Sequence, residues 1–310
     1  RLRLAMESTD NEILQLRLRV ALAQLDNTEI ELGKQLIQEL SDLDKASPPV
    51  LATICEASFA IKDYSRAEEM LRTFRYNFED SQYMRSAYKL RGFGQYDAKD
   101  YEGAMQTIAD TQAEYGTARD AAWAQLMKAD ILLKQGDLES AREENKNVFG
   151  VPAWRGEPEA QAIFQLGQVE EADGNPRLAH GYYQRTYFQY KGHADGHWAA
   201  EGYLASARCL KLMSEEPGLA SQERNDLKEA ERNTYRAMLY DGYVNKLPQA
   251  ESARQALSES DVAEITALIE SGVKTNILID VEGENKAEPE APDNPETPAD
   301  KEMQAAGGAA

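Results

Sequence analysis

The sequence predicts an all-α repeat protein, because three features run along its 310 residues. Ala and Leu far outnumber Val and Ile, and apolar residues return three or four positions apart, as on the buried face of a helix. No strand-like alternation with hairpin turns stands out. A turn followed by a small residue recurs at nearly constant spacing, which is typical of an array of helix pairs.

Four segments align without gaps around this turn. Each contains a polar residue suited to cap a helix and, four positions later, an alanine that closes the motif. The closing alanines, 37, 37 and 38 positions apart, are Ala67, Ala104, Ala141 and Ala179. Weaker copies end at Gly33 and Ala230. We therefore expect about six helix pairs followed by a C-terminal capping helix.

A second small residue precedes each closing residue by twelve positions. These residues are Ala21, Cys55, Gly92, Ala129 and Gly167. Two antiparallel helices approach closely only where both carry small side chains, so the two positions predict the crossing point of each pair. Gly136 and Gly174 suit the left-handed end of a first helix.

The sixth copy is longer, because 23 positions separate Ala207 from Ala230. We assign the excess to a loop over Met213–Leu219, which is either a tolerated surface insertion or part of a binding face. A last helix over about Pro248–Ser271 would cap the array. The sequence thus predicts a helical repeat domain over residues 1–274.

The remaining residues, 275–310, form an acidic segment rich in Pro, Glu and Ala. Residues 280–310 hold nine acids and two lysines. Such a composition cannot bury enough apolar area to offset chain entropy, so we expect this tail to be disordered. The full chain carries a net charge of −20, which disfavours nucleic acid and anionic membrane surfaces as partners. No apolar run approaches the ~20 residues of a membrane span.

The repeat pattern resembles the tetratricopeptide repeat (TPR) family. Leu166-Gly167 followed by Ala179-x3-Tyr183, and Ala67-x3-Leu71, match its two helix motifs, and the resemblance covers residues 12–240. The resemblance implies a right-handed superhelical solenoid. Asn145 departs from the large apolar residue of the family pattern, and the period exceeds the usual 34. The segment around Gln168 and Tyr182–Tyr187 also resembles bacterial cell-envelope TPR proteins of the Tol-Pal and outer-membrane-assembly type.

In the TPR family the first helices line a concave groove that binds a partner. Carried over by position, the resemblance implies a groove formed by Phe59, Lys89, Phe93, Tyr96, Trp123, Leu126, Asp130, Phe164 and Gln168. With Lys89 as its only basic residue, the set does not support binding of acidic peptide C-termini. A hydrophobic or basic segment of a protein or peptide fits better. Alternatively, some of these residues pack between neighbouring repeats.

Few residues suggest chemistry. His193, Asp195 and His197 could ligate a metal on a helix, but the flanking Gly192 and Gly196 favour a solvated turn. Gly92-Phe93-Gly94 lacks the residues of a phosphate loop and fits the packing position instead. An aromatic run between residues 182 and 198 is either a stacking platform or core. The sequence therefore predicts no enzyme activity, no cofactor and no metal site.

The predicted function is a non-catalytic scaffold that holds a partner segment in the concave groove. The alternative is a structural subunit of a bacterial cell-envelope complex. Because the sequence begins at Arg1 and not at Met, we expect residues upstream of it, and a lipid anchor among them would support this alternative. The compartment is unknown from these residues, and the periplasm is favoured over the cytoplasm.

Overall fold

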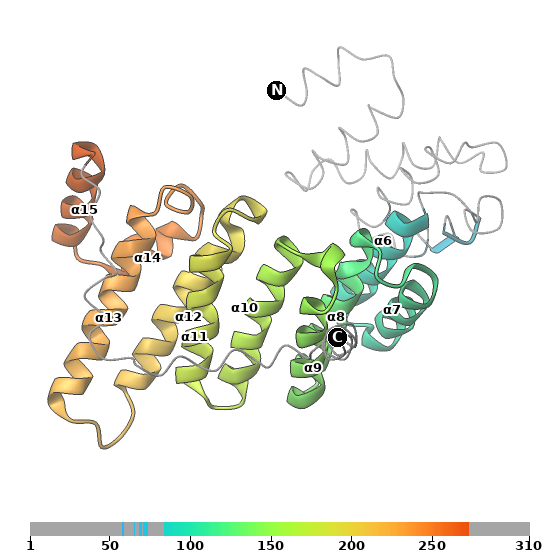
Figure 1. Cartoon of the computed structure of the whole chain (residues 1–310), viewed down its shortest axis with the longest axis horizontal. Coiled ribbons are helices and arrows are strands. Elements are labelled where there is room, and N and C mark those ends of the chain that lie inside the picture. Colours follow the sequence, from blue (N-terminus) through green and yellow to red (C-terminus); the bar gives the residue numbers. More distant parts are fainter. Residues whose placement is uncertain (1–57, 59–64, 66–67, 70, 74–83, 273–310) are drawn as a thin grey trace, which may run out of the picture.

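The computed structural model describes residues 58, 65, 68–69, 71–73 and 84–272 (Figure 1). This part of the chain consists of helices and short connections, without a strand. Eight helices form four antiparallel pairs, α6 (Met84–Asp97) with α7 (Tyr101–Tyr115), α8 (Ala122–Lys134) with α9 (Leu138–Phe149), α10 (Glu157–Ala172) with α11 (Pro176–Gln189), and α12 (His197–Ser214) with α13 (Ser221–Tyr240). Two further helices follow, α14 (Ala250–Ala256) and α15 (Glu259–Ser271). The TPR-like all-α architecture is confirmed over this range.

The polar residues of the repeated turn begin the second helices as predicted. Asp100 accepts a hydrogen bond from the amide of Gly103 at 3.0 Å, and Asp137 accepts one from the amide of Ser140 at 3.2 Å. In the third described pair, Asn175 makes no such bond, and Pro176 starts the helix with its fixed φ. Gly136 has a φ of 82°, a left-handed conformation that glycine adopts without steric cost.

The crossing points lie where the small residues predict. Ala104, Ala141 and Ala179 are fully buried. At Gly167 a Cβ atom would lie 2.5 Å from the ring of Tyr183, so the bare backbone is what admits this ring. At Gly92 a Cβ atom would lie 2.6 Å from the ring of Trp123 on α8, so this glycine has a packing role, but against the next pair and not at the crossing with α7. The earlier copies, including Ala67, Cys55 and Gly33, lie outside the described residues.

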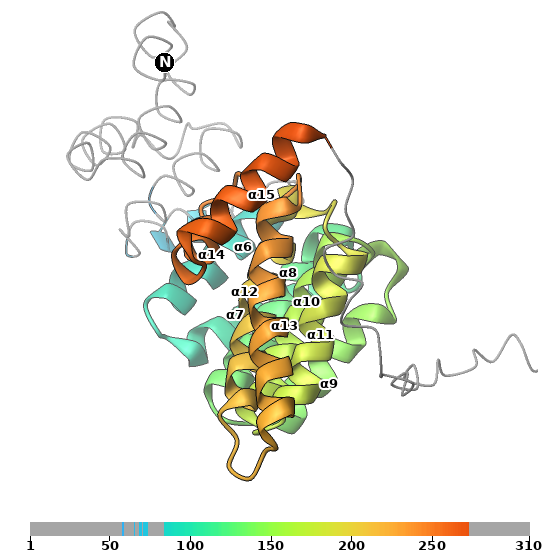
Figure 2. The same cartoon turned by 90° about the vertical axis from the view of Figure 1, so that its left-hand side faces the viewer.

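The first helices of successive pairs form one face of the array. Contacts join α6 with α8, α8 with α10 and α10 with α12. No comparable contacts join the described second helices α7, α9, α11 and α13 to one another. The first helices therefore lie on the inner side of the array and the second helices on the outer side. Figure 2 looks along the array from its C-terminal end, with α13 and the cap in front.

Two predicted boundaries differ from the structure. Met213 and Ser214 belong to α12, so the predicted loop over Met213–Leu219 is partly helix. The extra residues of this copy mainly lengthen α12 and α13 to 18 and 20 residues. The predicted single capping helix is two helices, because Ser258 caps α15 and ends the helical run before it. The predicted tail over residues 275–310 lies outside the described residues, so the domain boundary stays a prediction.

Candidate functional site

Phe93 is the exposed aromatic residue on the inner face of α6. Its side chain is 42% exposed, and its ring lies 5.9 Å from the ring of Trp123 on the next first helix. One turn earlier, the ammonium of exposed Lys89 lies 5.9 Å from the centre of the same ring. This distance allows a weak cation–π contact. The ring of Phe93 therefore lies between the Lys89 ammonium and the Trp123 ring, and part of it stays exposed to solvent.

A polar cluster flanks Phe93 toward the end of α6. The hydroxyl of Tyr96 donates a hydrogen bond to Asp130, and Lys134 lies 2.7 Å from the same carboxylate. Burial, together with the hydrogen bond to Asp130, raises the pKa of Tyr96 to about 12. Burial opposes charge on Lys134, but Asp130 and Tyr96 together outweigh it and raise the pKa of Lys134. Asp130 is thus already paired within the chain and adds little negative charge for a partner.

Three of the predicted groove residues are part of the core. Trp123 is 8% exposed, Leu126 3% and Phe164 8%. Leu126 packs in a cluster between α8, α9 and α10, and the ring of Phe164 lies 5.2 Å from the ring of Tyr183. These residues join neighbouring helices, which is the alternative that their positions left open.

Two predicted groove residues remain to be placed. Gln168 is half-buried on α10, and Phe59 lies outside the described residues. The surface that a partner could reach therefore narrows to Lys89, Phe93, Tyr96 and, further along the array, Gln168. Its binding role stays a prediction.

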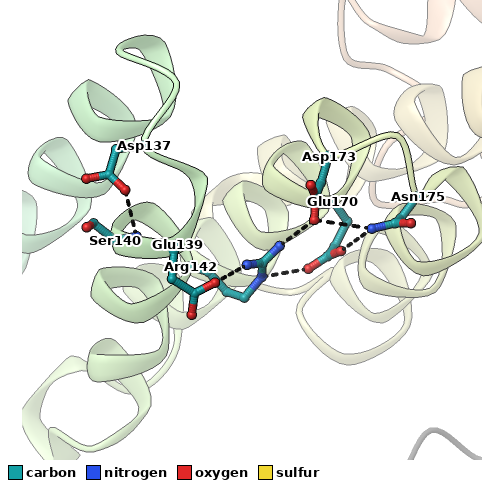
Figure 3. A network of polar contacts seen from close by, with 7 residues as sticks. All are labelled: Asp137, Glu139, Ser140, Arg142, Glu170, Asp173 and Asn175. Atoms are coloured by element: carbon teal, nitrogen blue, oxygen red, sulfur yellow. Dashed lines mark hydrogen bonds and ion pairs between the residues drawn. The ribbon is translucent and has the colours of Figure 1, made fainter.

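An ionic network that sequence reasoning missed joins the second described pair to the third (Figure 3). Arg142 on α9 donates to Glu170 at 2.9 Å and to Asp173 at 3.0 Å, both at the end of α10. Glu139 pairs with the same guanidinium, and Asn175 donates to Glu170. Burial alone would lower the pKa of Arg142, but Glu170 and Glu139 raise it. The network fixes how one pair sits on the next.

Buried amides provide a second type of link between helices. Gln125 donates to the carbonyl of Glu144 at 2.9 Å, and Gln165 donates to the carbonyl of Leu126 at 3.3 Å. The carbonyl oxygen of Gln165 is buried without a partner among the described residues. The only sequence signal for these residues is a polar side chain at a first-helix position where an apolar one is expected.

The residues considered for chemistry occupy ordinary structural positions. His193 and His197 are exposed, and within the described ranges no three His, Cys, Asp or Glu side chains converge as a metal site would require. Cys209 is buried, and burial raises its pKa to about 12. In the aromatic run, Tyr183 and Tyr187 are core residues, whereas Phe188 is 57% exposed. No described helix is both long and apolar enough to span a bilayer.

Comparison with known proteins adds little. No family model matches the chain, and neither does any curated protein. A solved structure titled "Functional Characterization of Pseudomonas Aeruginosa pilF" aligns with 78% of this chain and 96% of its own. The sequence identity is 14% and the TM-score 0.47, and a likeness at this level says nothing about what this chain does. The role of an envelope-complex subunit stays a prediction.

Proposed function

We propose that this protein is a non-catalytic scaffold that binds a segment of a protein partner along the first helices, with Phe93 as the anchor. The observation that supports the proposal is the exposure of this aromatic ring on the inner face, against Trp123 and beside Lys89. Interfaces derive most of their binding energy from a few aromatic or arginine anchors. A partner side chain packed on Phe93 would bury the exposed side of a ring that already contacts Trp123 and Lys89.

The partner segment is expected to be hydrophobic, with basic residues around it. An apolar side chain would cover Phe93. The excess of 20 negative charges over the whole chain attracts a basic segment at long range, which speeds its encounter with the surface. Lys89 would repel a basic residue placed directly on the ring, so the apolar residue should be flanked by basic residues and not replaced by one.

The test compares two phenylalanines of similar exposure. Phe93 is 42% exposed on the inner face, and Phe149 is 38% exposed at the end of a second helix. Peptides would be selected for binding to the full chain and their dissociation constants measured by fluorescence anisotropy. We expect Phe93→Ser to weaken binding about 30-fold, as for a central anchor, and Phe149→Ser to leave it unchanged. Circular dichroism would confirm that both variants fold. Selected peptides that bind the Phe93→Ser variant at full strength would refute the proposal.

A further inference from the structure

A hollow at the C-terminal end of the array lies between α12, α13 and the junction of α14 with α15. Its volume is about 750 Å³. It exists because the cap is short, since α14 and α15 have 7 and 13 residues while α12 and α13 have 18 and 20. Figures 1 and 2 show the two cap helices across the upper part of α13 only. Among the described residues, the lower part of this last pair therefore lacks the neighbouring pair that each of the three earlier described pairs has.

The hollow has more basic than acidic side chains, although the chain as a whole is strongly acidic. Four basic and three acidic residues line it. Arg232 and Asp261 neutralise each other through hydrogen bonds from the Arg232 Nε atom at 3.0 and 3.1 Å. The charged residues that remain are Lys211, Glu215, Arg224, Lys228 and Glu231. The balance is a net charge of +1, within a chain of −20.

Apart from Arg232, the basic side chains of the hollow lack close acceptors among the described residues. The Nε atom of Arg224 is buried without a hydrogen-bond partner among the described residues. A buried donor in this state destabilises a protein unless water or a ligand satisfies it. Over the same residues, the ammonium groups of Lys211 and Lys228 have no hydrogen bond or ion pair, and act only at longer range on Glu231. A carboxylate is a strong acceptor for a guanidinium and for ammonium groups, because the hydrogen bond joins opposite charges.

We propose that this hollow binds the carboxylate-rich segment of the same chain, residues 280–302. Nine acids and two lysines lie within residues 280–310, so the charges are complementary. The residues between α15 and this segment are long enough to bring it back to the hollow. Asp261 lines the hollow, and the helix from there to Gly272 is about 16 Å long. Asp280 follows Gly272 by eight residues, which extend up to about 26 Å.

Covalent attachment makes weak ionic contacts sufficient. A segment tethered this close has an effective concentration in the millimolar range, so a low intrinsic affinity still gives occupancy. The bound segment would cover the part of α12 and α13 that the short cap leaves open, and an acidic segment of another protein would have to displace it. The site is at the opposite end of the described array from Phe93, so failure of this proposal leaves the proposed function untouched, and the reverse also holds.

The test is zero-length carbodiimide coupling of the full chain, followed by mass spectrometry. The reagent joins a lysine to a carboxylate only when the two are in contact. We expect Lys211 and Lys228 to couple to carboxylates of residues 280–302 far more often than Lys146, which is also exposed but lies on α9. Arg224→Gln should lower this coupling severalfold, because hydrogen bonds to a charged group are worth about tenfold in binding. The control is Arg155→Gln, at an exposed position between α9 and α10.

Isotope labelling identifies which molecule supplies the carboxylate. In a mixture of ¹⁴N- and ¹⁵N-labelled protein, the proposal predicts cross-links between peptides of the same label. Cross-links that join different labels would show that a second copy occupies the hollow and would overturn the proposal. Coupling of Lys211 and Lys228 at the level of Lys146 would overturn it as well.

Discussion

The joint between α9 and α10 and the joint between α11 and α12 connect neighbouring repeats in different ways. The first includes the ion pairs of Arg142 with Glu170 and Asp173 (Figure 3). The second includes aromatic stacking, with Tyr187 and Tyr203 parallel to within 10° and their ring centres 3.9 Å apart. Ala141 and Ala179 close the pairs that precede the two joints, and both are fully buried, so the same internal packing of a pair is compatible with either type of joint.

The difference predicts which joint opens first. Aromatic burial gains free energy from the area removed from water and depends little on the exact position of any one atom. A buried ion pair depends on both partners, because removal of one leaves the other charged and desolvated. We therefore expect the α11–α12 joint to be the more stable and the α9–α10 joint to be the first to open in hydrogen exchange.

The largest effect is expected at the aromatic joint. Tyr187 is 1% exposed, so Tyr187→Ala removes a fully buried ring and leaves a cavity. Substitutions of this type cost about 3–5 kcal/mol of the free energy of unfolding, measured here by urea denaturation. The neighbouring Phe188 is 57% exposed, and Phe188→Ala should stay within about 0.5 kcal/mol of the native protein. Similar losses for the two variants would contradict the assignment of Tyr187 to the joint.

The second effect is expected at the ionic joint. Arg142→Met leaves Glu170, whose side chain is 7% exposed, without its guanidinium, and should cost about 2–3 kcal/mol. The double variant Arg142→Met with Glu170→Leu removes the stranded charge and should recover much of this loss. Thermal denaturation of both variants measures the difference. A double variant less stable than Arg142→Met alone would show that the pair is not the critical feature of this joint.

A somewhat smaller effect tests how closely α11 and α12 approach. At Gly202 a Cβ atom would lie 2.9 Å from the carbonyl oxygen of Tyr183 and 3.1 Å from Cβ of Thr186. Backbone cannot move aside easily, so Gly202→Ala should destabilise the protein by about 1–3 kcal/mol. The matched control is Gly181 on α11, where a Cβ atom would meet nothing within 4 Å. Gly181→Ala should stabilise the protein by about 0.4–1 kcal/mol, so the two glycine variants should shift the melting temperature in opposite directions.

The sequence predicts the inside of each pair better than the joints between pairs. Spacing alone locates Ala104, Ala141 and Ala179, because the crossing of two helices in one hairpin is a local property. Arg142 and Glu170 are 28 residues apart and meet only after two pairs have stacked. No local pattern marks such a partnership, which explains why the network was missed.

The burial of three predicted groove residues could not be read from the sequence for the same reason. Trp123, Leu126 and Phe164 are on first helices as predicted, but the tilt of each pair on the next decides whether a first-helix residue faces a partner or the neighbouring repeat. The break between α14 and α15 is different, because a sequence signal existed. Ser258 is followed three residues later by Asp261, a helix-start pattern, and the two do form the cap.

The last effect is negligible at neutral pH and appears only in acid, at the aromatic joint. His180 on α11 is hydrogen-bonded to Ser206 on α12 at 2.8 Å, and burial lowers its pKa from the usual 6.5 to about 4. Between these values the unfolded chain binds a proton that the folded protein does not, so the free energy of unfolding falls as the pH decreases, by up to about 1.4 kcal/mol per pH unit. His180→Gln should flatten this slope in urea denaturation series between pH 6.5 and 4. The exposed His193 serves as the control, since His193→Gln should leave the slope unchanged. If the free energy of unfolding of the His180→Gln variant still falls as steeply with decreasing pH, other groups cause the acid sensitivity and the prediction for the aromatic joint is wrong.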